Sequence, residues 1–290
     1  MFDIHQPVHV RFGVGVIEQL GKSVKQYGDK AMIVTGKSSA KNTGILARVE
    51  GQLQRAGIAS VVFAEVTPNP EYRIADAGAQ LAREFGCDFL IGLGRGSSID
   101  TAKAIAIGAC NEGSVWEYVE NKPAGNKYPV TALPVVVLIT NAGTGSEVNR
   151  FAVLSNANTM EKAGITSPYI YPKLSLVDPE LMISVPPRVT AESGLDIIFQ
   201  ALEAYVNKLA NPVADIYVEA AIKLVYENLT LAYRDSSNLK ARSNLALASV
   251  VGGMANDQVP SVLLHAMEHP VSGHQCGPWQ WPGGLVSGSV

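Results

Sequence analysis

The sequence predicts an α/β domain with a mostly parallel sheet at residues 1–185, followed by an α-helical domain at 186–290. Short apolar runs alternate with amphipathic segments in the first half of the chain, which is typical of a parallel sheet covered by helices on both faces. After Pro186-Pro187, longer segments of helical periodicity replace this pattern. A chain of 290 residues, 47% of them hydrophobic, is large enough for two domains and a sizeable core.

Each expected strand of the first domain is a short run of apolar residues bounded by turn residues. Strands buried in a parallel sheet are apolar on both faces, and these runs fit that pattern. The strands are expected at 31–35, 60–64, 88–92 and 134–139, and the helices between them at 39–57, 71–86 and 98–108.

The second domain is expected to contain only helices. Three of them are predicted at 188–208, 212–234 and 238–255, separated by Asn211-Pro212 and by the polar run 235–237. A fourth helix is predicted at 259–269. We expect it to stop at Pro270, because proline has no amide proton and clashes with the preceding turn.

The composition argues against several classes of function. The formal net charge is −3, from 23 basic and 26 acidic residues, so a nucleic-acid partner is not expected. No apolar stretch approaches the roughly 18 residues that cross a bilayer, so no membrane partner is expected either. The N-terminus lacks the features of a signal peptide, and the three cysteines are widely scattered. These features favour a cytoplasmic location.

Two glycine-rich loops each follow an expected strand. The segment Gly92–Asp100 opens a helix, where free backbone amides attract phosphate groups. The segment Asn141–Glu147 would lie at the same carboxyl edge of the sheet, and together the loops favour a nucleotide or dinucleotide site. The alternatives are a capping box formed by Ser97 and Asp100 in the first loop, and a plain surface loop in the second.

Histidines and one carboxylate suggest a second kind of site. His265, His269 and His274 lie within ten residues, and the first two share one helix face, where imidazoles can meet a metal or a substrate. Asp196 lies among apolar neighbours, with Gln200 one turn later. A metal ion or a helix-terminus role would offset the cost of burying this carboxylate, and ordinary capping or pairing is the alternative.

Taken together, four motifs resemble those of the iron-containing (group III) alcohol dehydrogenases. The family motifs GGGSSIDTAK, TTAGTGSEV, G-[LM]-D-A-x-x-H-A-x-E-A-Y and H-A-x-x-H-P are similar to Gly94–Lys103, Thr140–Val148, Gly194–Tyr205 and His265–Pro270 respectively. Weaker agreement extends from Arg11 to about His274. Several separate motifs in the right order make the resemblance specific.

The resemblance implies a dehydroquinate synthase-like fold, with a Rossmann-like dinucleotide domain, a helical metal domain and a cleft between them. It implies reversible hydride transfer between a nicotinamide cofactor and a small aliphatic alcohol or aldehyde. A divalent metal, Fe²⁺ or Zn²⁺, would polarise the carbonyl. The expected partner is this small molecule, and the resemblance is compatible with a homodimer.

The resemblance also implies roles for individual residues. Asp196 and His265 would bind the metal, with Gln200 at the position of a third ligand, and His269 would be a candidate in proton transfer. The residues expected to bind the cofactor are Gly36, Lys37, Ser38, Ser39, Gly94, Gly96, Ser97, Asp100, Thr140, Asn141, Thr144, Ser146 and Lys162.

The loop after the strand at 31–35 bears on the choice of cofactor. Members of the family that prefer NAD often carry an aspartate there, which binds the ribose hydroxyls and repels a 2′-phosphate. The segment Thr35–Lys41 has no acid, two serines and two lysines. We therefore expect NADP to be favoured over NAD, with purely solvated lysines as the alternative.

Three residues depart from the family pattern. Arg95 replaces the middle glycine of the phosphate loop, and we expect it to impair cofactor binding if that position needs a positive φ or a close approach of the phosphates. The alternative is that its guanidinium pairs with the phosphates. Gln200 replaces a histidine ligand, and an amide oxygen binds Fe²⁺ or Zn²⁺ less well than imidazole does. Trp279 occupies the position of the last ligand and cannot coordinate a metal.

The segment from Gln275 onward has no periodicity and contains two tryptophans, two prolines and four glycines. We hypothesise a frameshift near Gln275 followed by an early stop, so that the C-terminal part of the family fold is missing and apolar helix faces are exposed. Sequencing the gene tests this. Two other functions stay open: a glycerol-dehydrogenase-like or dehydroquinate-synthase-like enzyme, and a catalytically silent nucleotide-binding protein with an incomplete metal site.

Overall fold

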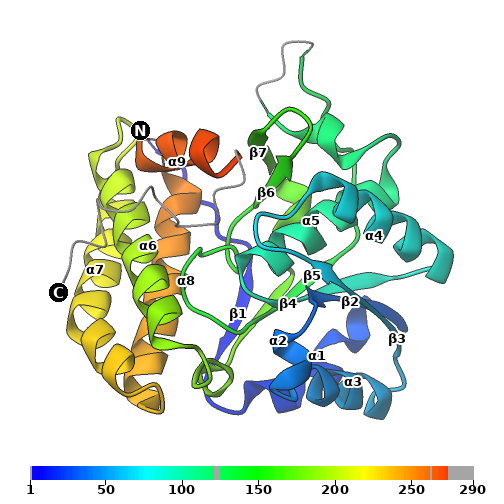
Figure 1. Cartoon of the computed structure of the whole chain (residues 1–290), viewed down its shortest axis with the longest axis horizontal. Coiled ribbons are helices and arrows are strands. Elements are labelled where there is room, and N and C mark those ends of the chain that lie inside the picture. Colours follow the sequence, from blue (N-terminus) through cyan, green and yellow to red (C-terminus); the bar gives the residue numbers. More distant parts are fainter. Residues whose placement is uncertain (1, 121–124, 262, 274–290) are drawn as a thin grey trace.

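The computed structural model describes residues 2–120, 125–261 and 263–273. Its centre is a parallel sheet of six strands in the order β1-β8-β5-β4-β2-β3 (Figure 1). The strands are β1 (His9–Phe12), β2 (Lys30–Gly36), β3 (Ala59–Val66), β4 (Phe89–Gly94), β5 (Val135–Ile139) and β8 (Leu174–Val177). The four strands predicted from apolar runs are confirmed as β2 to β5. The short strands β1 and β8 were not predicted, because four residues are too few to reveal a period.

Helices cover both faces of the sheet, as predicted. On one face lie α1 (Leu20–Val24), α2 (Ser39–Asn42) and α3 (Ile45–Arg55), and on the other lie α4 (Tyr72–Phe85) and α5 (Gly96–Cys110) (Figure 1). Neighbouring residues of a strand therefore enter different cores: Ile33 packs with Leu53 of α3, whereas Met32 packs with Ile105 of α5. This two-sided burial explains why the strands are apolar throughout.

The helical layer begins after β8 and packs beside the sheet (Figure 1). It contains α6 (Pro187–Val206), α7 (Pro212–Arg234), α8 (Leu239–Gln258) and α9 (Leu263–Gly273). The predicted division of the chain at residue 185 falls between β8 and α6. Asn211 caps α7, because its side-chain oxygen accepts hydrogen bonds from the amides of Val213 and Ala214.

The prediction for the last helix was wrong at both ends. The helix begins at Leu263 rather than 259 and continues three residues past Pro270 to Gly273. A proline removes a single backbone hydrogen bond from a helix, so the last turn of a helix can include it. Residues 274–290, which include the proposed frameshift, lie outside the described residues.

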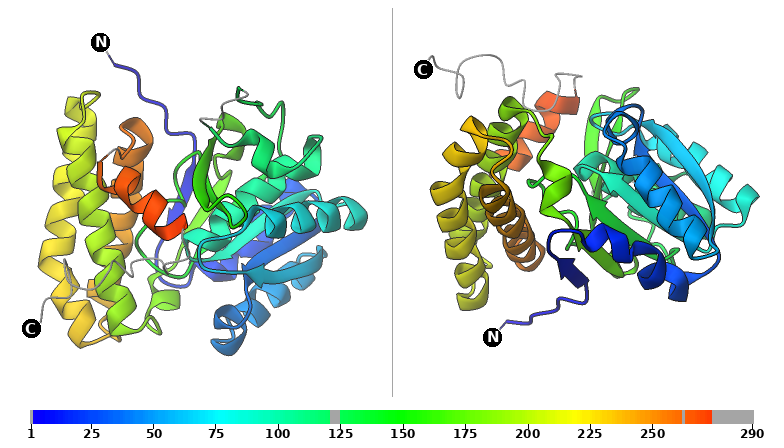
Figure 2. Two further views of the ribbon diagram at one scale, coloured as in Figure 1. Left: turned by 45° about the horizontal axis from the view of Figure 1, so that its top comes forward. Right: turned by 90° about the horizontal axis from the view of Figure 1, so that it is seen from below.

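A hairpin of β6 (Phe151–Asn156) and β7 (Glu161–Thr166) was also not predicted. Its two strands pair in antiparallel fashion and form a separate two-stranded sheet. The hairpin rises from the carboxyl edge of the main sheet toward α9, and both views of Figure 2 place α9 between it and the other helices of the helical layer. It thereby joins two parts of the molecule that are distant in sequence.

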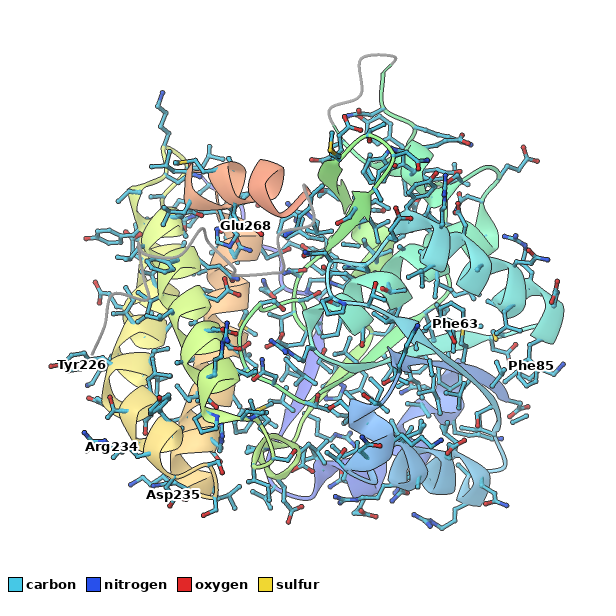
Figure 3. All side chains as sticks on the ribbon, viewed as in Figure 1. Phe63, Phe85, Tyr226, Arg234, Asp235 and Glu268 are labelled. Carbon is cyan, nitrogen blue, oxygen red and sulfur yellow. The ribbon has the colours of Figure 1, made fainter. Side chains whose placement is uncertain are left out.

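The outer surface of the helical layer is partly apolar. Tyr226 projects from the outer face of α7 and is 84% exposed (Figure 3). Val206, Leu209 and Ile216 are also largely exposed. Among the described helices, none combines the length and apolar character needed to cross a bilayer. Exposed apolar side chains therefore lie on α6, on α7 and in the loop between them, whereas the proposed frameshift stays a prediction.

The two layers meet through a close approach of backbone to backbone. Gly145, in the loop after β5, has a φ of 66°, which strongly favours glycine. It packs against Gly253 of α8, where an added Cβ atom would lie 2.6 Å from the Cα atom of Gly145. Beside this contact, the hydroxyl of Ser249 donates to Glu147 at 2.7 Å and accepts from the amide of Gly143 at 3.0 Å.

We predict that Gly253→Ala destabilises the chain by about 2 kcal/mol or more, because the new methyl group must push the loop away from α8. Urea unfolding measures this free energy. Gly51→Ala in α3 is the matched control, since its Cβ would meet no atom nearer than 3.5 Å. The control should stabilise the chain by about 0.5–1 kcal/mol. Equal stability of the two variants would contradict the close packing.

Candidate active site

A cavity of ≈ 1720 Å³ lies at the carboxyl ends of the strands, between the sheet and the helical layer. Strands β2, β4 and β5 are neighbours and run parallel, so the loops that follow them meet at one edge of the sheet. The opposite wall comes from α6 and α9, and the β6–β7 hairpin closes one side. The cavity is larger than the usual 300–1,000 Å³ of small-molecule sites.

The structure brings nearly all sequence-predicted site residues to this one cavity. It is lined by Gly36, Lys37, Ser38, Ser39, Gly94, Gly96, Ser97, Asp100, Thr140, Thr144, Ser146, Lys162, Asp196, Gln200 and His265. Among the predicted site residues whose side chains the structure describes, Asn141 is the exception. Its side chain is buried against α6 and donates to the hydroxyl of Ser193 at 2.7 Å. Asn141 therefore supports the loop and does not face the cavity.

The phosphate loop follows β4 directly. Gly94 has a φ of 145°, and a Cβ atom there would lie 2.7 Å from the hydroxyl of Ser98. No side chain caps α5, so the capping box considered for Ser97 and Asp100 is wrong. The Asp100 carboxylate instead accepts from the hydroxyl of Ser146 at 2.6 Å. The amides of Ser98 and Ile99 donate to the carbonyl oxygen of Arg95, so an anion at the start of α5 would meet the amides of Gly96 and Ser97.

Arg95 does not strain the loop, contrary to our expectation. Its φ of −92° and ψ of −179° are extended values that any residue adopts, and the positive φ belongs to Gly94. Its side chain lines the cavity near α6. Burial lowers the pKa of the Arg95 guanidinium, whereas the carboxylates of Glu192 and Asp196 raise it. The arginine therefore places a cation close to the predicted metal ligand.

Lys103 on α5 fixes the two glycine loops relative to each other. Its ammonium group is fully buried, and its three protons are shared among five oxygen atoms of Ser146, Asn149 and Phe151 at 2.7–3.0 Å. Burial lowers the pKa of Lys103 to about 8, although Asp100 and Glu147 counteract this effect. Our sequence reasoning did not single it out. The sequence did contain a signal for its burial, because Lys103 is the single charged residue in the otherwise apolar run 102–107.

The metal ligands expected from the sequence converge in the cavity. Asp196 and Gln200 lie one turn apart on α6, and His265 reaches them from α9. Oδ1 of Asp196 is 3.6 Å from Nε2 of His265, too long for a hydrogen bond, and this buried oxygen has no hydrogen-bond partner. The side chain of His269, and all of His274 and Trp279, lie outside what the structure describes.

Glu203 holds His265 from the opposite side of the ring, and sequence reasoning did not identify it. Its Oε2 atom lies 2.6 Å from Nδ1 of His265. Burial lowers the pKa of His265, but Asp196 and Glu203 outweigh it and raise that pKa to about 9. A glutamate one turn beyond Gln200 was the available signal, because positions 196, 200 and 203 share a helix face.

A partly buried ion pair crosses one side of the cavity. Lys162 on β7 contacts both carboxylate oxygens of Glu268 on α9 at 3.0 Å. Glu268 is buried and projects from the lower side of α9 in Figure 3. The pair therefore ties the hairpin to the helix that carries His265. Lys162, which we expect to bind the cofactor, is thus paired with the carboxylate of Glu268 from the same chain.

Comparison with known protein families shows which family the chain belongs to. The model described as iron-containing alcohol dehydrogenase matches residues 7–179, and the C-terminal model of the same family matches residues 190–276. The chain belongs to the iron-containing alcohol dehydrogenase family. The family expected from the four motifs is confirmed.

Individual relatives agree with this assignment. The 1,3-propanediol dehydrogenase of Citrobacter freundii is 39% identical over 275 residues, which are 94% of this chain and 70% of that protein. The solved archaeal Red Sea brine pool alcohol dehydrogenase ADH/D1 has a TM-score of 0.92 at 37% identity, covering 95% of this chain and 70% of that chain. Sulfoacetaldehyde reductase from Bifidobacterium kashiwanohense, solved with NAD⁺, has a TM-score of 0.86 at 34% identity, covering 94% and 71%.

The chain spans about two thirds of the length of the curated relatives that it matches. The similarity to these iron-containing alcohol dehydrogenases confirms the predicted fold class, a parallel-sheet α/β domain followed by a helical domain. The class of activity expected from the sequence, nicotinamide-linked oxidoreduction of alcohols and aldehydes, is that of the relatives.

The raised pKa of His265 predicts how the stability of the metal-free chain depends on pH. The pKa is about 9 in the folded chain, against 6.5 for free histidine. The ion pairs of His265 with Asp196 and Glu203 therefore stabilise the fold fully below pH 6.5, and this contribution is lost as the pH rises through 9. Its size is about 3 kcal/mol.

Urea unfolding of the chelator-treated chain and of His265→Gln, from pH 6 to pH 10, measures this contribution. The difference in the free energy of unfolding between the two proteins isolates His265 from other groups that titrate in this range, such as Lys103. This difference in free energy should shrink above pH 8. A difference that stays constant across the range would contradict the raised pKa.

Proposed function

We propose that the chain binds a nicotinamide dinucleotide and a divalent metal in the cavity and interconverts a small aliphatic alcohol and its aldehyde. The observation that carries this proposal is the convergence of Asp196 and His265, 69 positions apart in the sequence, on the cavity that the phosphate loop lines. A metal beside a phosphate-binding loop is suited to hydride transfer, which needs a polarised carbonyl next to the nicotinamide ring.

The residues present fit a metal ion, with a reduced set of ligands. Two ligands bound to one metal at about 2.1 Å with a tetrahedral angle lie about 3.4 Å apart, near the 3.6 Å between Asp196 and His265. The oxygen of Asp196 that lacks a hydrogen bond would gain a partner. Gln200 adds an amide oxygen, a weaker donor for Fe²⁺ or Zn²⁺. No three His, Cys, Asp or Glu side chains within the described part of the chain form a metal cluster.

Once bound, the metal would polarise the carbonyl and stabilise the alkoxide. The chain supplies the remaining parts of the mechanism. Asp196 would balance the charge of the metal, and the partly buried pair of Lys162 and Glu268 would limit water at one side of the cavity. His269 stays our candidate for moving a proton to or from the substrate oxygen.

The dinucleotide is proposed to lie along the carboxyl edge of the sheet. The glycine loop and the start of α5 would hold its diphosphate, and the loop after β2 would hold the adenosine ribose. We propose a preference for NADP, because Lys37, Ser38 and Ser39 are exposed on the cavity wall and the loop contains no acid. Glu65 lies 3.7 Å from Lys37 and reduces this preference.

The substrate is proposed to be small, aliphatic and neutral. Lys162 and Glu268 place two charged groups in the cavity wall. A neutral substrate remains the better proposal, since these two charges are paired with each other. We further propose a cytoplasmic location; a homodimer remains a prediction.

The second candidate is a nucleotide-binding protein without catalytic activity. The observation that favours it is the glutamine at position 200, which leaves one carboxylate and one imidazole as strong metal ligands among the described residues. A chain that binds cofactor and never retains metal would have this function.

We predict that Gln200→His tightens the binding of Zn²⁺ and Fe²⁺ at least about tenfold and raises NADPH-dependent reduction of butyraldehyde, because imidazole is the stronger ligand. Competition with a chromophoric chelator measures the metal affinity. Gln80→His, on an exposed position of α4, is the matched control and should change neither quantity. Unchanged metal affinity in Gln200→His would favour the catalytically silent protein.

We predict that the chain binds NADPH more tightly than NADH and that Lys37→Ala removes most of this difference. A lysine beside the 2′-phosphate contributes on the order of 1 kcal/mol, or about fivefold in affinity. Fluorescence titration with each cofactor measures both constants. Lys41→Ala is the control, because Lys41 does not line the cavity. Tighter binding of NADH by the unchanged chain would refute the proposed preference.

A further inference from the structure

We propose that Glu203 is a positioning residue of the metal site, which holds the imidazole of His265 through Nδ1 so that Nε2 faces Asp196. This inference rests on the proposed function, since it concerns how the chain prepares a ligand for the metal. Glu203 lies in the last turns of α6 and is only 3% exposed, although it carries a charge.

Both oxygens of this carboxylate are engaged by the start of α9. Oε1 accepts hydrogen bonds from the backbone amides of Leu264 and His265. Oε2 lies 2.6 Å from Nδ1 of the His265 ring. These contacts fix the backbone of the helix start and the orientation of the ring at once. The carboxylate also satisfies two amides that the first turn of a helix leaves without partners.

The contact determines which nitrogen of His265 is presented to the cavity. A carboxylate accepts hydrogen bonds, so Nδ1 carries a proton while Glu203 holds it. Nε2, on the other side of the ring, lies 3.6 Å from Oδ1 of Asp196. Nε2 is therefore the nitrogen left to bind a metal. A carboxylate behind the ring also increases the basicity of the coordinating nitrogen.

The local sequence of α6 produces this arrangement. Asp196, Gln200 and Glu203 occupy positions i, i+4 and i+7, so they lie on one face of the helix. The first two side chains face the cavity, and the third supports the histidine that completes the group. Glu203 is not itself placed as a ligand, because its two oxygens are already occupied by α9.

Glu203→Gln separates positioning from mere packing, because glutamine keeps the size of the side chain. In one orientation, the side-chain oxygen of the glutamine accepts from the two backbone amides, and its NH₂ group faces Nδ1 of His265. Nδ1 must then accept a hydrogen bond, so the proton of the imidazole ring moves to Nε2. In the flipped orientation, the NH₂ group of the glutamine faces the two backbone N–H groups, so donors face donors. The variant should therefore bind Zn²⁺ about 10- to 100-fold more weakly. Glu219→Gln, on an exposed position of α7, should bind Zn²⁺ like the unchanged chain.

A second measurement does not require metal. The ¹H–¹⁵N spectrum of the metal-free chain should contain a protected Nδ1–H signal of His265, identified by its absence in His265→Gln. This signal should be lost in Glu203→Gln. Glu203→Asp keeps the carboxylate on a shorter stem and should restore part of both the signal and the affinity, which makes it the informative variant if Glu203→Gln does not fold.

The outcomes distinguish this inference from the proposed function. A chain that binds no Zn²⁺ but shows the Nδ1–H signal, lost in Glu203→Gln, would refute the proposed metal site and retain the positioning role. A chain that binds Zn²⁺ with the same affinity in Glu203→Gln would overturn the inference while the metal site stands. Persistence of an unchanged Nδ1–H signal in Glu203→Gln would overturn it as well.

Discussion

The contact between Gly145 and Gly253 is the constraint on which the cavity depends. It brings the backbone of the loop after β5 against the backbone of α8, so the helical layer lies at a fixed distance from the edge of the sheet. Asp257 strengthens the junction, since it accepts from the hydroxyl of Tyr171 at 2.6 Å and from the amide of Arg150 at 3.2 Å. Without this approach, α6 would not face the phosphate loop, and Asp196 would have no site to complete.

The buried ammonium of Lys103 extends the same constraint to the phosphate loop. Burying a charge is expensive unless it is fully hydrogen-bonded, and five oxygen acceptors offset that cost here. Since these acceptors follow β5 and the lysine belongs to the helix that follows β4, the two loops cannot move independently. The cavity therefore has a rigid wall on the sheet side, whereas its other wall depends on how α9 is held.

Local patterns in the sequence predicted much of this structure. The apolar runs identified β2 to β5, and Asn211-Pro212 fixed the start of α7 at its observed residue. Spacing also indicated that Asp196 and Gln200 share a face. Contacts between distant segments were not predictable in this way: Lys162 and Glu268 are 106 positions apart, and only the folded hairpin brings them together. The backbone of Arg95 was misjudged for a related reason, because the turn assigns the positive φ to Gly94 instead.

Two carboxylates hold α9. One acts at the start of the helix, and the other acts at the last residue of the helix whose side chain the structure describes. Glu203 secures the first turn and the ring of His265, and Glu268 secures the following turn to β7 through Lys162. The helix therefore connects His265, the proposed metal ligand, to Lys162, which we expect at the cofactor. Any cofactor that takes Lys162 as a partner must compete with Glu268, and a released Glu268 would loosen the helix that carries His265. On the proposed function, the position of α9 would therefore link the cofactor site to the metal site, and Glu203 would still hold the start of the helix if a cofactor took Lys162 from Glu268.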